Sequence, residues 1–333
     1  MSTTVENHKT DVKSVDALAQ NFRDLKAEIG KVIIGQEDVV NAVLIALFSN
    51  GHSLLVGVPG LAKTLLVSTI SEVLDLDFKR IQFTPDLMPS DIMGSEILDD
   101  NRKFTFNKGP LFANIVLADE INRTPPKTQA ALLEAMQEKS VTVSGTRHIL
   151  PKPFFVLATQ NPIEQEGTYP LPEAQLDRFL LYLRLNYPSE QKELDILKAT
   201  TSDTTTPLNA VISGDDILQL QTLVRQVMIS MDMLTFVNQF IRETRPSLTA
   251  IDAIKEWVEW GAGTRAGQAL ILSAKANALL NGRYSVTYED IKALAHPVLR
   301  HRILINYKGE SDGITSDDIT DLLLEQVEIP NVL

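Results

Sequence analysis

The chain has 333 residues, of which 44% are hydrophobic and 22% charged, a composition typical of soluble globular proteins and long enough for two domains. It has no cysteine, which excludes disulfide bonds, thiolate zinc sites and cysteine nucleophiles. Its formal net charge of −12 makes nucleic acid an unfavourable default partner, because most of the surface repels a phosphate backbone.

No segment carries the signs of a membrane or export signal. The apolar stretch 39–48 is too short to cross a bilayer, and the polar first ten residues lack the regions of a signal peptide. The five histidines are scattered, and none forms a close pair at metal-ligand spacing. These features predict a cytoplasmic protein without a membrane span.

The first fifty residues are expected to hold a flexible start and two helices. Residues 1–13 are polar and are expected to be a flexible N-terminus. From residue 14, apolar side chains at spacings of three and four predict a helix that ends near Gly30, and a second is expected over 37–48. Between them, the apolar turn with Ile33 and Ile34 has two open interpretations, core packing or an adenine pocket.

The central motif lies between an apolar run at 54–56, typical of a buried strand, and a segment from 65 to 70 with helical spacing. Strand, loop and helix in this order are typical of a phosphate-binding loop, in which backbone N–H groups and the positive end of a helix dipole face one small volume. The residues expected to bind a triphosphate there are Gly57, Val58, Pro59, Gly60, Leu61, Ala62, Lys63, Thr64 and Leu65.

Three residues at the end of this loop carry specific expectations. Lys63 provides a positive charge for the β- and γ-phosphates of ATP, and Thr64 provides a hydroxyl ligand for Mg²⁺. Ala62 stands where the usual pattern has glycine. Because a methyl group disfavours a strongly positive φ, we expect the backbone at Ala62 to be nearly helical.

An apolar run at 114–118 predicts a strand covered on both faces, and it ends in Asp119 and Glu120. Because ligands gather beyond the carboxyl ends of parallel strands, both acids are expected to face the phosphate loop. Asp119 is suited to hold Mg²⁺, directly or through water, and Glu120 to deprotonate the water that attacks the γ-phosphorus. An acidic N-cap of the next helix would explain one acid but hardly both.

A further strand is expected at 154–159, and Asn161 follows its carboxyl end. This amide is suited to hold the attacking water or a γ-phosphate oxygen, although an asparagine before a proline also commonly forms a turn. Between the strands, 84–110 is too long for a plain connection and is interpreted as a functional insertion. A β-hairpin is expected near 141–150.

With further strands at 78–83 and 180–185, the chain is predicted to have an α/β nucleotide-binding domain over 14–186. A smaller, all-helical domain is predicted over 187–333. Its helices are expected at 189–198, 215–228, 231–244, 267–281, 288–299 and 316–326, and Ala174 to Phe179 is also expected to be helical.

The order of the phosphate loop, the acid pair and Asn161 is that of an AAA+ ATPase. Segments 57–64, 117–123 and 158–179 resemble the MoxR family of these ATPases, and the match spans nearly the whole chain. The resemblance implies a P-loop three-layer sandwich with a five-stranded parallel sheet, followed by a helical lid. It also implies a homo-oligomeric ring, a hexamer, which binds Mg²⁺ and ATP between subunits and projects the insertion and the hairpin near Ser144 from its face.

The same resemblance assigns roles to arginines. Arg178 resembles the arginine finger that reaches a neighbour's γ-phosphate, and Arg265, within 261–266, resembles the second sensor of the lid. Both roles suit guanidinium groups, which pair with phosphate oxygens. Local alternatives remain open: Arg178 can pair with a nearby acid, and Arg265 can cap a helix end. Arg123 is a second candidate for the interface.

The predicted function is that of a chaperone-like ATPase, in which hydrolysis moves the two domains and so remodels, assembles or metal-loads a protein partner. The resemblance implies a client with a von Willebrand factor A domain. Two alternatives are an ATP-dependent assembly scaffold with slow hydrolysis and a nucleic-acid-linked remodeller, which the negative charge disfavours. A kinase is the weakest interpretation, because Glu120 is placed to activate water.

Overall fold

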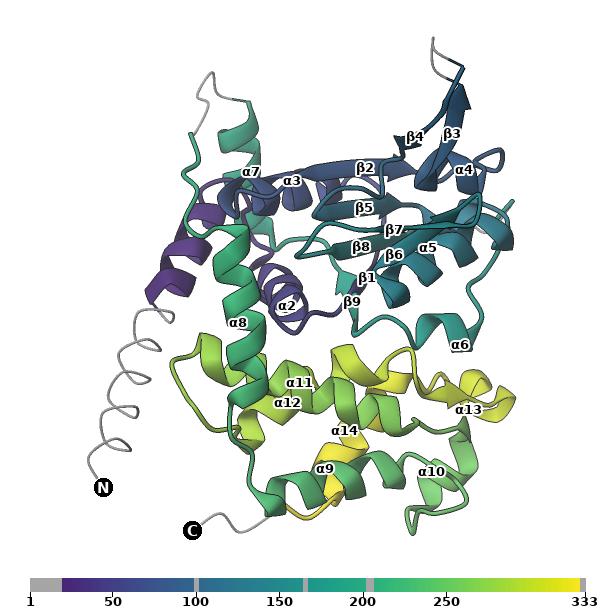
Figure 1. The fold of residues 1–333 in the computed structure, drawn as a ribbon. Coiled ribbons are helices and arrows are strands. Elements are labelled where there is room, and N and C mark those ends of the chain that lie inside the picture. Colours follow the sequence, from purple (N-terminus) through teal and green to yellow (C-terminus); the bar gives the residue numbers. More distant parts are fainter. Residues whose placement is uncertain (1–19, 99–101, 164–166, 202–206, 330–333) are drawn as a thin grey trace, which may run out of the picture. The chain divides into compact units, whose positions relative to one another are not determined.

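The computed structural model of the chain describes residues 20–98, 102–163, 167–201 and 207–329 (Figure 1). Contacts divide the chain into two compact units, a sheet unit over residues 24–179 and 183–219 and a lid unit built mainly from residue 220 onward. The segment 187–219, which the sequence-based division assigned to the lid, groups with the sheet unit. No helix of the described residues is long and apolar enough to span a membrane.

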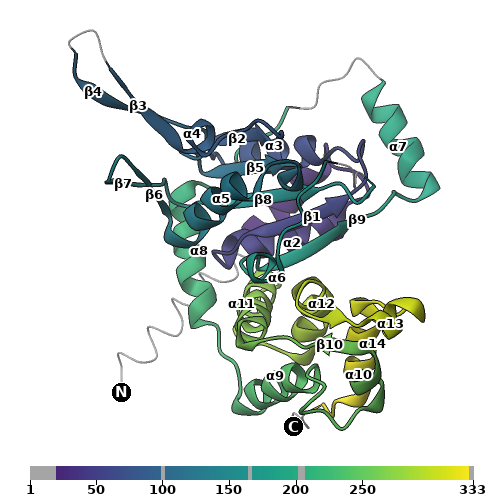
Figure 2. The ribbon, with the colours of Figure 1, turned by 90° about the vertical axis from the view of Figure 1, so that its right-hand side faces the viewer.

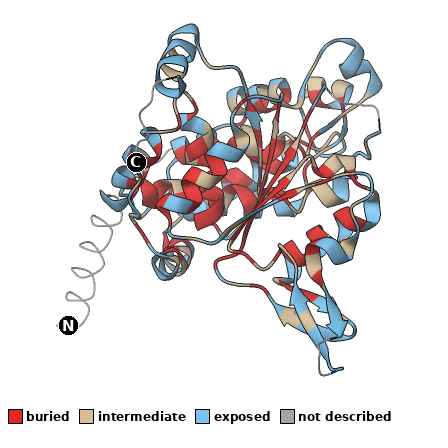
Figure 3. Ribbon diagram, turned by 90° about the horizontal axis from the view of Figure 1, so that it is seen from above, coloured by how far each residue is buried: buried red, intermediate tan, exposed pale blue. Residues whose placement is uncertain are grey.

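The sheet unit is built on five strands in the order β2–β5–β8–β1–β9 (Figure 1), and β2, β5, β8 and β1 pair in parallel. The central strands are continuous apolar runs because helices lie on both faces of the sheet (Figure 3). This confirms the predicted five-stranded parallel sheet. The strands are β1 (Ser53–Gly57), β2 (Phe78–Gln82), β5 (Ile115–Asp119), β8 (Phe155–Gln160) and β9 (Leu181–Leu185).

The helices of this unit follow the predicted pattern with small shifts at their ends. The chain is helical over residues 20–30 and buries Phe22, Leu25 and Ile29, while the predicted start at 14–19 lies outside the described residues. The helix expected up to Phe179 is only four residues long. The helices are α2 (Glu37–Phe48), α3 (Lys63–Val73), α5 (Pro126–Glu138), α6 (Glu173–Leu176) and α7 (Glu190–Thr200), and a 3₁₀ turn, η1, covers Ile121–Arg123.

Two hairpins extend from the same side of the sheet unit (Figure 2). The insertion consists of a short helix and one hairpin, namely α4 (Pro89–Met93), β3 (Gly94–Leu98) and β4 (Phe104–Lys108). The second hairpin pairs β6 (Ser140–Val143) with β7 (Thr146–Ile149), as predicted. The rings of Phe106 and His148 stack with their centroids 3.8 Å apart, so the two hairpins contact each other.

The lid unit is helical as predicted, and it also contains two short helices, at residues 252–257 and 307–311, and a two-stranded ribbon that were not predicted. Strands β10 (Val258–Trp260) and β11 (Leu304–Ile305) form an antiparallel ribbon that no sequence pattern indicated. Helix α8 (Gly214–Gln226) spans the boundary between the two units. The other helices are α9 (Met231–Glu243), α10 (Asp252–Trp257), α11 (Thr264–Leu280), α12 (Tyr288–Leu299), α13 (Tyr307–Ser311) and α14 (Ser316–Gln326).

A buried acid fixes the start of α12. Asp290 is fully buried and accepts hydrogen bonds from Arg283 at 2.6 Å and from the backbone N–H of Thr287 at 2.9 Å. Burial alone would raise the pKa of Asp290, but these bonds lower it below its ordinary value. Thr287 and Asp290 form the capping box of α12, and Arg283, four residues before Thr287, is bound to the same acid.

Candidate functional site

The predicted phosphate loop connects the end of β1 to the start of α3. Lys63, the first residue of α3, donates a hydrogen bond from Nζ to the carbonyl of Gly57, and Gln36 donates one to the carbonyl of Leu61 at 3.2 Å. A Cβ on Gly57 would lie 2.7 Å from Cβ of Leu185, so the neighbouring strand requires glycine there. These contacts shape the loop around the helix start.

The expectation for Ala62 is wrong. Its backbone is left-handed, with φ 54° and ψ 30°, where a nearly helical conformation was predicted. A left-handed residue directly before a right-handed helix turns successive N–H groups toward one point, which forms an anion-binding concavity. The alanine therefore adopts a conformation that costs an L-residue about 1–2 kcal/mol, at the point where the loop becomes a helix.

Asp119 ends β5, and both of its carboxylate oxygens accept hydrogen bonds. Oδ1 accepts from the hydroxyl of Thr159 at 2.6 Å, and Oδ2 accepts from Nε and NH2 of Arg80 at 3.0 and 2.7 Å. The side chain of Asp119 is only 13% exposed. Its carboxylate is therefore oriented from two neighbouring strands, β2 and β8.

Glu120 has a left-handed backbone with φ 58°. The N-cap of α5 is Pro125, so neither acid is the helix cap considered as an alternative. Its backbone N–H donates to the hydroxyl of Thr159 at 2.9 Å. Its Oε2 accepts from Gln82 at 2.7 Å and from Arg123 at 3.2 Å. The hydroxyl of Thr159 thus links the two neighbouring acids.

Sequence reasoning missed Arg80, Gln82 and Thr159. Arg80 and Gln82 are polar residues two apart on β2, and Thr159 is a fully buried polar residue that directly follows the apolar residues 155–158 of β8. A polar residue within a buried strand needs a partner, and this signal was available in the sequence. Its partner was not, because the order of the strands is a property of the fold.

Asn161 directly follows β8 and is 5% exposed. Its Oδ1 accepts from the N–H of Ile163 at 3.1 Å, which is the local turn considered as the alternative. Its Nδ2 is buried and has no hydrogen-bond partner among the described residues. The register pairs Val56 with Gln160, so Asn161 lies level with the start of the phosphate loop, with one donor unused.

The apolar turn before α2 lies beside the linker that follows β9. Ile33 is 6% exposed, which fits core packing, whereas Ile34 is half-buried. A Cβ on Gly35 would lie 3.0 Å from Cβ of Lys192 and 3.5 Å from Cβ of Pro188. An adenine contact by Ile33 and Ile34 stays a prediction.

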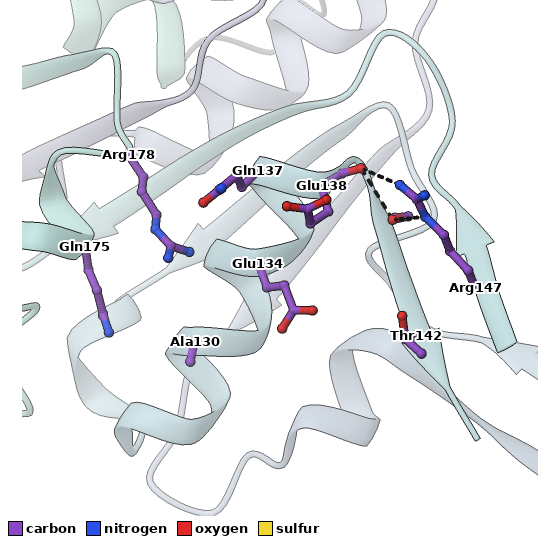
Figure 4. A pocket seen from close by; sticks show the side chains of 9 residues that line it. Ala130, Glu134, Gln137, Glu138, Thr142, Arg147, Gln175 and Arg178 are labelled. Carbon is purple, nitrogen blue, oxygen red and sulfur yellow. Dashed lines mark hydrogen bonds between the residues drawn. The ribbon is translucent and has the colours of Figure 1, made fainter. Parts of the chain in front are cut away.

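Arg178 lies apart from these residues, in a polar pocket of about 520 Å³ (Figure 4). Within the described part of the chain its guanidinium makes no hydrogen bond or ion pair, although Glu134 and Glu138 line the same pocket. Arg123, the other candidate, pairs with Glu120 of its own chain at 3.2 Å. The other residues that line the pocket are Ala130, Gln137, Ser140, Thr142, Arg147 and Gln175.

Arg265 is the second residue of α11, which begins three residues earlier than predicted, at Thr264. It therefore lies in the first turn of the helix, where a positive charge is not favoured by the helix dipole. Because the favourable place for such a charge is the other end, a capping role explains Arg265 poorly. Its role as a sensor stays a prediction.

The donors around the phosphate loop fit a magnesium nucleotide. Carboxylate and hydroxyl oxygens are the ligands that Mg²⁺ prefers, and Asp119 and the exposed Thr64 supply them. Lys63 and the N–H groups of the first turn of α3 supply positive charge for phosphate. Val58, Pro59, Gly60 and Leu65 complete the predicted loop and its helix start.

Comparison with known proteins identifies the family. Residues 52–181 match the ATPase family associated with various cellular activities (AAA), and residues 252–322 match the AAA lid domain. Over 98% of its length the chain is 40% identical to Chaperone MoxR1 of Mycobacterium tuberculosis, of which it covers 87%. The chain belongs to the MoxR family of AAA+ ATPases. The family resemblance inferred from the sequence is therefore confirmed. Residues 164–166, which belong to the segment 158–179 that carries this resemblance, lie outside the described residues.

Two further proteins are similar to this MoxR-family chain over nearly the full length of both chains. It is 44% identical to protein YeaC of Bacillus subtilis, with 91% of this chain and 92% of YeaC covered. A solved structure of a candidate ATPase from Cytophaga hutchinsonii has a TM-score of 0.92 at 42% identity, covering 98% of this chain and 99% of that one. Membership of the AAA+ ATPases implies nucleotide binding at the phosphate loop.

Proposed function

We propose that this MoxR-family chain hydrolyses Mg²⁺-ATP at the phosphate loop and uses the reaction to remodel a protein partner. The observation that carries the proposal is the meeting of three strand ends: β1 leads to the phosphate loop, β5 ends in Asp119 and Glu120, and β8 leads to Asn161 with its unused donor. Parallel strands that end beside one another place these groups around one ligand.

In the proposed reaction, Lys63 and the helix-start N–H groups bind the β- and γ-phosphates. Thr64 and Asp119 would hold Mg²⁺, which would neutralise phosphate charge. Glu120 takes a proton from water as the water oxygen bonds to the γ-phosphorus and the bond to the β–γ bridging oxygen breaks. Asn161 Nδ2 donates a hydrogen bond to the γ-phosphate or to that water.

We further propose that Arg178 completes the site of a neighbouring subunit in a homo-oligomeric ring, a hexamer. The proposal is supported by its guanidinium, which has no ion-pair partner among the described residues and lines an open polar pocket (Figure 4). An unpaired guanidinium can bind phosphate oxygens without first breaking an internal bond. Arg123, which is bound to Glu120, is less suited to this role.

The lid and the client are the remaining parts of the proposal. Arg265 would contact phosphate from the lid, so that the nucleotide biases the angle between the two domains. The name of one relative, Chaperone MoxR1, supports action on another protein. A client with a von Willebrand factor A domain, metal loading, an adenine pocket at Ile33 and Ile34, and a cytoplasmic location stay predictions.

The test is the Mg²⁺-dependent rate of ATP hydrolysis per subunit over a wide range of protein concentration. We expect a rate that rises steeply with concentration, because the site is completed by a second subunit. ATP binding that assembles a ring without hydrolysis at any concentration would instead favour the scaffold function. A chain that binds no nucleotide would contradict both.

A further inference from the structure

Arg80 holds the carboxylate of Asp119 through two hydrogen bonds to a single oxygen. Its Nε and NH2 donate to Oδ2 at 3.0 and 2.7 Å, and the same NH2 donates to Oε1 of Gln82 at 2.6 Å. Gln82 in turn donates to Oε2 of Glu120 at 2.7 Å. A continuous set of side-chain hydrogen bonds therefore connects the two acids through β2.

The position of these residues on β2 explains the arrangement. Side chains two apart on a strand share a face, so Arg80 and Gln82 both face the acids, while Lys79 lies on the other face. The strand pairs in parallel with β5, with Gln82 opposite Asp119. The hydrogen bonds to Asp119 and Gln82 fix the position of the Arg80 guanidinium, although the side chain is 46% exposed.

We propose that Arg80 is a positioning residue that competes with Mg²⁺ for Asp119, so that Oδ2 becomes free to bind the metal only when the guanidinium leaves it. This inference rests on the proposed function, in which Asp119 holds Mg²⁺. A guanidinium at hydrogen-bond distance offsets much of the charge with which a carboxylate attracts a second cation. Oδ1 accepts one hydrogen bond, from Thr159, whereas Oδ2 accepts two from Arg80, so Oδ2 is the oxygen whose acceptor capacity the guanidinium fills.

Displacement of Arg80 has a consequence for Glu120. When its guanidinium leaves Asp119, its NH2 also loses the geometry that binds Oε1 of Gln82. Gln82 is then free to change its rotamer and withdraw its donor from Glu120. Release of Arg80 from the first acid would thereby leave Oε2 of the second acid with Arg123 as its remaining donor.

A purely structural role for Arg80 predicts the opposite result. If Arg80 only fixed Asp119 in a geometry suited to Mg²⁺, its removal would weaken metal binding. Competition predicts that removal strengthens it. The two roles therefore differ in the sign of one measurable quantity.

That quantity is the ratio of two dissociation constants for a fluorescent, non-hydrolysable ATP analogue, measured in EDTA and in excess Mg²⁺. Because the Arg80 side chain is 46% exposed and solvent weakens its ion pair, we expect Arg80→Met to raise this ratio, the constant in EDTA divided by that in Mg²⁺, by about two- to fivefold over the wild-type chain. Arg80→Lys keeps the charge and should stay nearer to the wild-type ratio. Lys79→Met removes the same charge from the other face of β2 and should leave the ratio unchanged.

An unchanged or lowered ratio in Arg80→Met, in a wild-type chain that binds the analogue and hydrolyses ATP, would overturn the inference alone. A rise of equal size in Lys79→Met would also overturn it, since the effect would then be one of overall charge. A wild-type chain that binds no analogue would overturn the proposed function and this inference with it. Thermal unfolding of each variant confirms that it is folded.

Discussion

The side-chain amide of Gln82 donates a hydrogen bond of 2.7 Å to Oε2 of Glu120, and Arg123 donates to the same oxygen at 3.2 Å. Among the described residues, Oε1 accepts no hydrogen bond. Two donors on one oxygen orient the carboxylate while its other oxygen stays available. This is the arrangement required of a group that accepts a proton from water.

The first prediction concerns this oxygen. Glu120→Gln keeps the size of the side chain but removes its basicity, so we expect hydrolysis to fall by about 10²–10⁴-fold, the range of general-base catalysis. The affinity for ATP should stay within about twofold, because Glu120 is not assigned a contact to the ground-state phosphates. Single-turnover hydrolysis and equilibrium binding measure the two quantities. Equal loss of both would show that Glu120 acts in binding.

The second prediction concerns Arg178. If it acts on a neighbour's nucleotide, Arg178→Ala should bind ATP normally and hydrolyse it up to about 10³–10⁵-fold more slowly. Lys63→Ala should lose nucleotide binding but still present Arg178. Mixing the two inactive variants should therefore restore part of the activity, because one supplies the phosphate loop and the other the arginine.

The control for this experiment is the same mixture made with a chain that carries both substitutions. It should stay inactive with Lys63→Ala, because neither chain then supplies a competent loop. If the first mixture also stays inactive while both variants form oligomers with the wild-type chain, Arg178 acts within its own subunit.

The third prediction follows from the left-handed backbone of Ala62, with φ 54°. Ala62→Gly removes the strain of the methyl group but makes the unfolded chain more flexible, so the free energy of unfolding should change by less than about 1 kcal/mol. Ala62→Val places a β-branched residue at a positive φ, which should distort the loop and weaken ATP binding at least about tenfold. Urea unfolding and ATP titration test the pair, and normal binding by Ala62→Val would contradict the role of this conformation.

Ala62 also shows which parts of the site can be predicted from a sequence. The types and order of the loop residues indicated a phosphate site, because Lys63 and Thr64 carry their chemistry wherever the loop places them. The φ angle of one residue does not follow from its type, since a loop can impose a conformation that the isolated residue disfavours. The expectation for Ala62 failed for this reason.

The side-chain contacts between neighbouring strands could not be predicted from the sequence for a related reason. Continuous apolar runs at 115–118 and 155–158 predicted buried strands correctly. The order β2–β5–β8 did not follow from them, and it is this order that brings Arg80 to Asp119 and Thr159 to both acids. Strands as short as β11, with two residues, have no periodicity to detect.

The last prediction concerns His52, which directly precedes β1, and Lys139, which caps the end of α5. The ring of His52 accepts a hydrogen bond at Nδ1 from the N–H of Val156, so the neutral ring carries its proton on Nε2. That nitrogen lies 3.1 Å from the carbonyl of Met136 and 3.0 Å from Nζ of Lys139. Burial is the main cause that lowers the pKa of His52 well below 6.5, and burial also lowers the pKa of Lys139 to about 8.

The lowered pKa of Lys139 predicts how stability depends on pH. Between pH 8 and 10.5 the unfolded chain holds more protons at this amine than the folded chain, so the contribution of Lys139 to the free energy of unfolding rises with pH, by up to about 3 kcal/mol. Below pH 8 the amine is protonated in both states, and the cost of burying its charge is fully present. Lys139→Met removes this cost, so its stability relative to wild type should be greatest near pH 7 and should decline by pH 10. Urea unfolding of both chains at pH 7, 8, 9 and 10 measures the difference, in which the other titrating groups cancel. A difference that does not change with pH would mean that the folded chain leaves the Lys139 pKa near its ordinary value.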